Sequence, residues 1–198
     1  MENIIRQTTE LAMYIVRAYV CPGDVVVDAT CGNGKDSLAL AAMNPAKLYA
    51  FDVQEDAVCE TIRLLEENGC KGSLADGRIT VQQLAHEKLC EFFKDSDEGD
   101  CPLKAVIFNL GYLPGGDKQI TTKSATTLEA VQGAMELIQK DGVVCITMYS
   151  GHKEGREERD ALLEFAEGLD SAKWHCAYIS MPNQKNDPPE ILLITRKL

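Results

Sequence analysis

The chain has 198 residues, which suits one well-buried domain, so we expect a single domain over residues 1–198 with an N-terminal helix, residues 1–22, packed on its sheet. Hydrophobic residues make up 45% and charged residues 26%, a globular composition, and no apolar run is long enough for a membrane span. The formal net charge of −11 excludes a general nucleic-acid coat protein, but not an enzyme with a local basic rim. The N-terminus lacks the layout of a secretory signal, so a cytoplasmic location is expected.

Apolar periodicity predicts alternating helices and strands. Ile4, Thr8, Leu11, Ala12, Ile15, Val16 and Tyr19 share one face of the expected N-terminal helix. We predict strands over residues 25–28, 48–52, 78–81, 105–108, 143–148, 174–180 and 191–196. We predict helices over residues 37–42, 58–69, 128–137 and 157–169, with a short one after the third strand.

This order predicts an α/β fold with a mostly parallel seven-stranded sheet and helices on both faces. The last two strands are joined by a polar loop, residues 182–189, without a helix, so we expect them to be antiparallel neighbours. The acidic stretch of residues 95–100 is expected to be a solvated connection.

Eight cysteines are present, but no two have Cys-x-x-Cys spacing, so no metal site is expected. Several lie in apolar patterns, where a free thiol acts as a small hydrophobic group. We therefore expect reduced, mostly structural thiols, with Cys31 as an exception because it lies in an expected ligand loop. The eight are Cys21, Cys31, Cys59, Cys70, Cys90, Cys101, Cys145 and Cys176.

The loop after the first strand, residues 28–36, carries the features of a nucleoside site. Gly32 and Gly34 let the backbone approach a ligand, and Asp52, at the end of the next strand, can accept hydrogen bonds from ribose. A dinucleotide site would normally have a third glycine, which is missing here. Asp28 would repel a pyrophosphate but suits a cation, which favours S-adenosylmethionine with its ammonium and sulfonium groups.

Asn109-Leu110-Gly111-Tyr112 follows the apolar strand 105–108 and precedes a Pro-Gly-Gly turn. The carboxyl ends of parallel strands are where open α/β sheets bind ligands. A side-chain amide, exposed carbonyls and an aromatic ring at this edge can hold an amino group and a flat base.

These motifs resemble those of the class I S-adenosylmethionine-dependent methyltransferases, whose Rossmann-like sheet also ends in two strands without a helix between them. More narrowly, the chain resembles the family formerly labelled "putative rRNA methylase", members of which methylate 5-aminomethyl-2-thiouridine at the tRNA wobble position. The resemblance covers nearly the whole chain and includes residues 28–36, 51–54, 109–115, 149–152, Asn183 and Pro188-Pro189. It departs from the broad superfamily at Thr30, where a glycine is usual.

The resemblance implies a cofactor site. Asp28 and the turn from Thr30 to Gly34, with Asp36, would hold the methionine part, Asp52 and Gln54 the ribose, and Ala85 and His86 the adenine. The turn comprises Thr30, Cys31, Gly32, Asn33 and Gly34. Asp36 is equally explained as a helix-start carboxylate and His86 as a helix-entry residue.

The resemblance also implies an acceptor site, because Asn-Leu-Gly-Tyr is a variant of the Asn-Pro-Pro-Tyr signature of nitrogen methyltransferases. Asn109 and the carbonyl of Leu110 would accept hydrogen bonds from the target amine, Gly111 would leave room for it, and Tyr112 would stack on the base. His152 is a candidate proton acceptor, with a solvent-facing or phosphate-binding histidine as the alternative.

Contacts to RNA are less defined. Asn183 and Lys185 could touch RNA, although loop polarity explains them equally well. Several basic residues are expected near one edge of the sheet, namely Lys118, Lys123, Lys153, Arg156 and Lys185, but scattered solvated side chains would give the same pattern.

The first hypothesis is therefore an N-methyltransferase that acts on the aminomethyl group of a wobble uridine, with the tRNA anticodon stem-loop as its substrate. An rRNA or small-amine methyltransferase and a non-catalytic nucleoside-binding regulator are the alternatives. A nicotinamide reductase is disfavoured because the third glycine is missing. The expected oligomeric state is a monomer or a homodimer.

Overall fold

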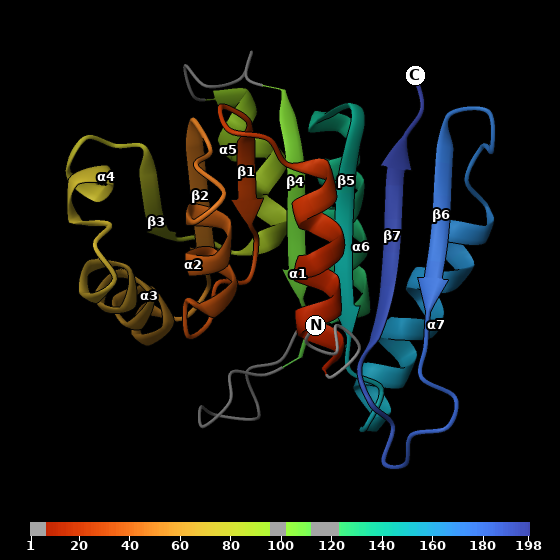
Figure 1. Ribbon diagram of the computed structural model, residues 1–198. Coiled ribbons are helices and arrows are strands. Elements are labelled where there is room, and N and C mark those ends of the chain that lie inside the picture. The colour runs from red at the N-terminus through yellow and green to blue at the C-terminus, as the bar shows by residue number, and fades with distance from the viewer. Residues whose placement is uncertain (1–6, 96–101, 112–122) are drawn as a thin grey trace, which may run out of the picture.

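The computed structural model describes residues 7–95, 102–111 and 123–198. A seven-stranded sheet with the order β3-β2-β1-β4-β5-β7-β6 forms its centre (Figure 1). The strands are β1 (Val25–Asp28), β2 (Lys47–Asp52), β3 (Ile79–Gln83), β4 (Leu103–Asn109), β5 (Ile138–Met148), β6 (Trp174–Ile179) and β7 (Glu190–Arg196).

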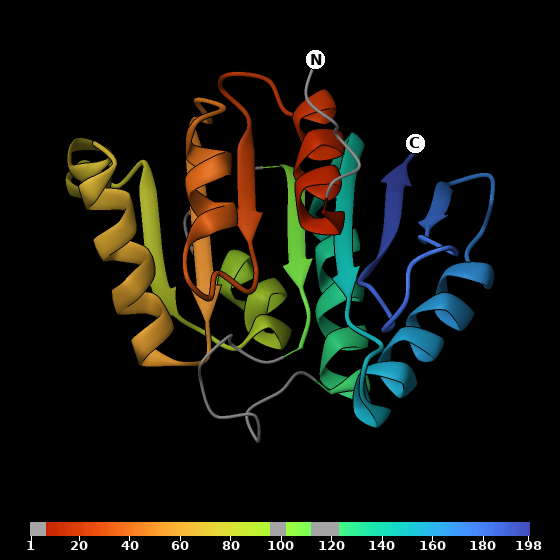
Figure 2. The same ribbon diagram turned by 60° about the horizontal axis from the view of Figure 1, so that its bottom comes forward.

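The helices are α1 (Thr8–Tyr19), α2 (Lys35–Ala41), α3 (Glu55–Glu67), α4 (Lys71–Ala75), the 3-10 helix η1 (His86–Lys88), α5 (Leu89–Asp95), α6 (Ser124–Leu137) and α7 (Lys153–Glu167). Helices α1, α2 and α3 cover one face of the sheet, and α5, α6 and α7 cover the other (Figures 1 and 2). The predicted α/β class with helices on both faces is confirmed.

The inner parts of the central strands, such as residues 105–108 and 143–146, are apolar, since both of their faces are covered. In β5, Val144, Ile146 and Met148 belong to the core beneath α6 and α7, whereas Val143 and Cys145 belong to the core beneath α1. Successive side chains of such a strand point into the two cores in turn. Both sets are therefore hydrophobic, which explains the continuous apolar runs in the sequence.

Strand β7 is antiparallel to both β5 and β6, while the pairs from β3 to β5 are parallel. The prediction that the last two strands are antiparallel neighbours is therefore confirmed. Because β7 runs backwards between β5 and β6, the 180–189 connection lies at the same edge of the sheet as the end of β5.

Some element boundaries differ from the predicted ones. Strand β5 begins at Ile138 rather than at residue 143, because Ile138 pairs with Leu103 before an irregularity at residues 139–142, where Asp141 has a φ of 58°. Helix α7 begins at Lys153, four residues early, because His152 caps it. The short helix α4 was not predicted. Ile4, Cys101 and the acidic stretch of residues 96–100 lie outside the described residues.

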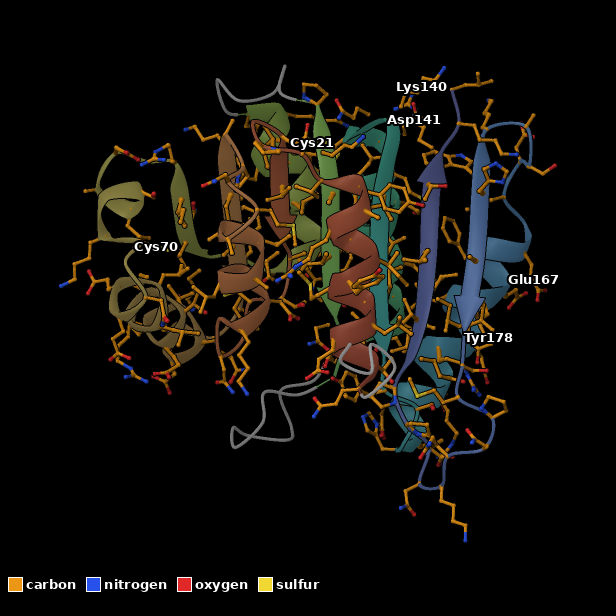
Figure 3. All side chains as sticks on the ribbon, in the orientation of Figure 1. Cys21, Cys70, Lys140, Asp141, Glu167 and Tyr178 are labelled. Atoms are coloured by element: carbon orange, nitrogen blue, oxygen red, sulfur yellow. The ribbon has the colours of Figure 1, made fainter. Side chains whose placement is uncertain are left out.

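The seven cysteines in the described part of the chain are free thiols, in agreement with the expectation of reduced cysteines. Cys21 and Cys70 lie on separate parts of the fold (Figure 3). Among the residues described, no group of three or more His, Cys, Asp or Glu side chains is arranged to hold a metal ion. No helix in the described ranges has the length and apolar character that crossing a membrane requires.

Helix α6 approaches α5 closely at Gly133, where a Cβ atom would lie 2.9 Å from Cβ of Cys90. We expect Gly133→Ala to lower the free energy of unfolding by about 1–3 kcal/mol, because the helices must separate, although alanine favours a helix. Gly72→Ala in α4 is the matched control, since no atom lies within 4 Å of its Cβ position. Urea unfolding measures both; a Gly133→Ala protein as stable as the control would contradict close packing here.

Candidate active site

The candidate site lies at the carboxyl ends of β1, β2 and β4. Strand β1 pairs with β2 on one side and with β4 on the other, so the chain order reverses between β1 and β4. Such a switch point is where open α/β sheets bind ligands. The 28–36 turn, Asp52 and Asn109 all reach this edge, which comes forward in Figure 2.

Asp52 holds the cofactor turn against the end of β2. Its carboxylate oxygens accept hydrogen bonds from the backbone N–H groups of Gly32 and Gln54, each at 3.0 Å. One residue earlier, the N–H of Cys31 donates to the carbonyl of Phe51 at 2.8 Å. The Asp52 carboxylate is thereby fixed at the edge where a ribose hydroxyl would meet it.

Gly34 is required where the turn enters α2. Its φ of +77° lies in the left-handed region, and a Cβ atom there would stand 2.9 Å from Cα of Thr61 on α3. The Thr61 hydroxyl also donates to the carbonyl of Gly32 at 3.1 Å. Contacts with α3 therefore fix the conformation of the turn. Because Gly32 and Gly34 have no side chains, the backbone of the turn stays accessible to a ligand.

Asp28 is a fully buried carboxylate beneath this turn. Its Oδ2 accepts a 2.6 Å hydrogen bond from the Ser37 hydroxyl, and its Oδ1 accepts a 3.3 Å bond from the N–H of Thr30. Burial, followed by the charge of Asp36, raises the pKa of Asp28 to about 7. A cationic ligand would restore the charged carboxylate, so the site suits an ammonium or sulfonium group.

Asn109 is joined to the cofactor turn by two hydrogen bonds. Its backbone N–H donates to Oγ1 of Thr30 at 2.7 Å, and its amide Nδ2 donates to Oδ2 of Asp36 at 3.2 Å. A carboxylate oxygen accepts, so the amide nitrogen faces Asp36 and the amide oxygen is directed elsewhere. Thr30, which stands where the superfamily usually has glycine, thus holds Asn109, the first residue of the segment expected to bind the acceptor amine.

Asp36 lies in the first turn of α2 and contacts Asn109, so the helix-start alternative describes only part of its role. Burial raises the pKa of Asp36, although the hydrogen bond from Asn109 lowers it.

Cys31 lies buried in the same turn, and burial raises the pKa of its thiol. A neutral buried thiol is not a nucleophile, so Cys31 serves the turn through its backbone.

Tyr149 was not among the predicted site residues, yet the Asn109 side chain is near enough to its hydroxyl to lower the pKa of the tyrosine in part. Its ring atoms lie 3.9 Å from the Cβ position of Gly111. Burial, and then the charge of Asp36, raises the pKa of the tyrosine. Its place directly after the apolar run 143–148 is the sequence signal that could have found it.

His152 is the N-cap of α7, where its Nδ1 accepts a hydrogen bond from the N–H of Gly155 at 3.0 Å. The neutral ring that makes this bond carries its proton on Nε2. Accepting a further proton at Nδ1 would cost α7 its cap. The role of His152 as a proton acceptor stays a prediction.

Ala85 and His86 follow β3 beside Asp52, whose carbonyl accepts from the N–H of Leu84 at 2.9 Å. His86 begins η1, as its helix-entry alternative requires, and its ring meets Phe108 edge-on. Burial lowers the pKa of His86, and its Nε2 is buried without a hydrogen-bond partner among the described residues. Glu87 Oε2 lies 3.9 Å from this nitrogen, too far for a hydrogen bond. The nitrogen and the half-exposed Val53, which the sequence analysis missed, suit a ligand with an apolar, hydrogen-bonding ring.

The remaining predicted residues are at the periphery or not described. Asn183 and Lys185 are exposed on the 180–189 connection. Of the predicted basic edge, Lys153 pairs with Glu157 and Arg156 donates to the carbonyl of Ser150, both at the start of α7. Lys123 precedes α6 at its N-cap position and makes no side-chain capping bond. Tyr112 and Lys118 lie outside the described residues.

The sheet order, the acid-lined turn after β1 and Asp52 after β2 together define a class I, Rossmann-like methyltransferase. The model of the family described as "Putative rRNA methylase" matches residues 48–195. The chain belongs to this family, as its motifs predicted.

Similar proteins agree with this assignment. The chloroplastic tRNA (mnm(5)s(2)U34)-methyltransferase of Arabidopsis thaliana is 34% identical over 97% of this chain and 70% of its own length. A crystal structure from Clostridium thermocellum, titled as a "putative rRNA-methylase", is 36% identical, with a TM-score of 0.85, over 96% of this chain and 98% of its own. A "putative methyltransferase" from Streptococcus mutans in complex with SAH is 32% identical, with a TM-score of 0.80, over 99% of both chains.

The protein is therefore an S-adenosylmethionine-dependent methyltransferase, and the predicted cofactor is confirmed. The turn fits this cofactor, because it combines a buried acid, a second carboxylate at its edge and a glycine-enforced open backbone. Which residue contacts which part of the cofactor remains a proposal.

Substituting Asp28→Asn tests the buried acid. In the folded protein Asp28 keeps its proton up to a pH of about 7, whereas the ordinary pKa of an aspartate side chain is 3.8. The free energy of unfolding of the wild type should therefore fall as the pH rises from 3.8 to about 7. The neutral amide removes this loss, and Asp28→Asn should be more stable than wild type at pH 8, on the order of a few kcal/mol, but not at pH 4.

Urea unfolding of the cofactor-free protein at both pH values measures the effect. The exposed Asp56→Asn is the control and should follow wild type. Parallel stability curves for wild type and Asp28→Asn would contradict the raised pKa.

Proposed function

We propose that the protein methylates the aminomethyl nitrogen of 5-aminomethyl-2-thiouridine at wobble position 34 of tRNA, forming the methylaminomethyl group. The observation that carries this proposal is the Asn109 amide, whose nitrogen is bonded to Asp36 so that its oxygen is available as an acceptor. The printed name of the Arabidopsis relative, with its wobble uridine, supports the choice of substrate. The anticodon stem-loop is then the RNA partner.

The cofactor contacts follow the geometry of the turn. Asp28, Asp36 and the Thr30–Gly34 backbone would receive the methionine part. Asp52 and Gln54 would bind the ribose, while Ala85 and His86 would flank the adenine, with Val53 as an added contact. When bound, S-adenosylmethionine supplies the methyl group and a positive charge on sulfur.

The acceptor amine must reach the site without its proton. An amine that resembles lysine has a pKa near ~10.4, so roughly one molecule in 10³ is neutral at pH 7, and restoring the lone pair costs about 4 kcal/mol. The Asn109 amide oxygen and the Leu110 carbonyl would accept hydrogen bonds from the two N–H groups of the neutral amine. Only the uncharged amine keeps a lone pair for the methyl group, and these acceptors orient it.

The other predicted residues have roles in this scheme. Gly111 leaves room for the amine, and Tyr112 would stack on the base. His152 would take the released proton or contact a phosphate. Asn183 and Lys185, both exposed at the carboxyl edge, would contact the RNA backbone.

Methyl transfer to tRNA from a strain that lacks this methylation tests the proposal. Purified protein and labelled S-adenosylmethionine should convert 5-aminomethyl-2-thiouridine to its methylaminomethyl form, as measured by mass spectrometry of nucleosides. The same tRNA with an unmodified wobble uridine is the control and should gain no label. Label in rRNA or in a small amine, with none in this tRNA, would favour an alternative substrate, and no transfer at all would favour a binding protein.

Substituting Asn109→Ala should lower kcat by about 10²-fold or more, because the amine loses an acceptor that aligns it in the transition state. The Kd for the cofactor should change little, since the backbone bond to Thr30 remains possible. Calorimetry and single-turnover rates measure the two effects, with Asn68→Ala, at the exposed C-cap position after α3, as a matched control. Equal loss of turnover and cofactor binding would restrict Asn109 to a cofactor role.

A further inference from the structure

A second binding feature lies on the carboxyl edge, beyond β4. A hollow of about 350 Å³ opens between the start of α1, Tyr149 and the connection from β6 to β7. None of the sequence motifs assigned to the cofactor or to the acceptor amine lies in α1 or in the prolines of this connection. The hollow is therefore considered as a separate binding site.

The walls of the hollow are tied together. Oγ1 of Thr8, a buried residue, donates to the carbonyl of Pro189 at 3.0 Å and lies 3.9 Å from the sulfur of Met181. Within the connection, the N–H of Gln184 donates to the carbonyl of Met181 at 3.0 Å. Because α1 and the connection are bonded across 181 residues of sequence, the hollow is formed before any ligand arrives.

The hollow adjoins the candidate acceptor site through one side chain. Tyr149 lines the hollow, and its ring lies 3.9 Å from the Cβ position of Gly111, two residues after Asn109. The sheet order β1-β4-β5-β7 puts Asn109 between the cofactor turn on β1 and the hollow beside β5 and β7. A group that receives methyl at Asn109 can therefore extend away from the cofactor, toward the hollow.

The lining selects the kind of ligand. Side-chain amides come from Gln7 and Gln184, a hydroxyl from Thr9, and apolar surface from Met181, with the ring of Tyr149 between them. None of the described residues that line the hollow carries a charge. The described lining offers a phosphate no counter-charge, whereas an uncharged heterocycle could stack on the ring and pair its polar edge with the amides.

We infer that this hollow is the base subsite, which holds the pyrimidine ring of the target nucleotide after it leaves the anticodon stack. The inference rests on the proposed function, because it takes the acceptor to be a nucleotide in an RNA loop, whose unstacked bases can be splayed out. Tyr149 then has two tasks: its ring faces the base, and its hydroxyl positions the Asn109 amide.

Filling the hollow tests the inference. Gln184 is exposed at its rim, so Gln184→Trp should fold normally and put an indole where the base would lie. The KM for an anticodon stem-loop with 5-aminomethyl-2-thiouridine should rise about tenfold or more, while the calorimetric Kd for SAH stays within about twofold. If Gln184→Trp lowers the melting temperature, Gln7→Trp on the facing wall replaces it, with the same expected KM.

Gln132→Trp is the matched control. Gln132 is also exposed and lines a hollow of about 370 Å³ at the opposite edge, beside Trp174 and Arg196, so its KM should remain that of wild type. Tyr149→Phe keeps the ring and should lower kcat without raising KM.

The outcomes separate the two proposals. A wild-type KM in the filled variant overturns the base subsite, while turnover by the wild-type protein leaves the proposed function standing. A KM rise as large in Gln132→Trp also overturns the subsite. A wild-type protein that does not methylate the stem-loop contradicts the proposed function and, with it, the inference.

Discussion

The contact between the turn that follows β1 and the last residue of β4, Asn109, is the interaction on which the site depends. The Thr30 hydroxyl accepts the backbone N–H of Asn109, and Asp36 accepts its amide, across 79 and 73 residues of sequence. Helix α3 and Asp52 hold the turn after β1, and β5 holds the end of β4 through the Leu110 N–H. A displacement reaction gains most from such fixed alignment of its two partners.

Charge is concentrated where this contact lies. Asp28, Asp36 and Asp52 surround one turn; burial raises the pKa of the first two, and the charge of Asp36 raises that of Asp28 further. Such an arrangement costs stability in the free protein and favours a cationic ligand, as is common at functional sites. The same acidity would repel RNA, so under the proposed function the RNA backbone would meet other surfaces, such as the exposed start of α7 and the 180–189 connection.

The carboxyl edge is thus divided along the sheet. The turns of β1 and β2 suit the cofactor, Asn109 at the end of β4 suits the amine, and the proposed base subsite lies beside β5 and β7. The reversed strand β7 is essential for this division, because it returns the chain to the edge where α1 begins. Tyr149 connects the last two regions through its ring and its hydroxyl.

Local patterns in the sequence predicted the order of strands and helices, the antiparallel ending, the cofactor turn and the position of Asn109. These features depend on apolar periodicity and turn residues within a few positions of one another. The early start of β5, the partner of Thr30, the role of Tyr149 and the hollow could not be predicted in this way. They arise from contacts between residues far apart in sequence, and only the order of strands in the folded sheet decides which of these residues become neighbours.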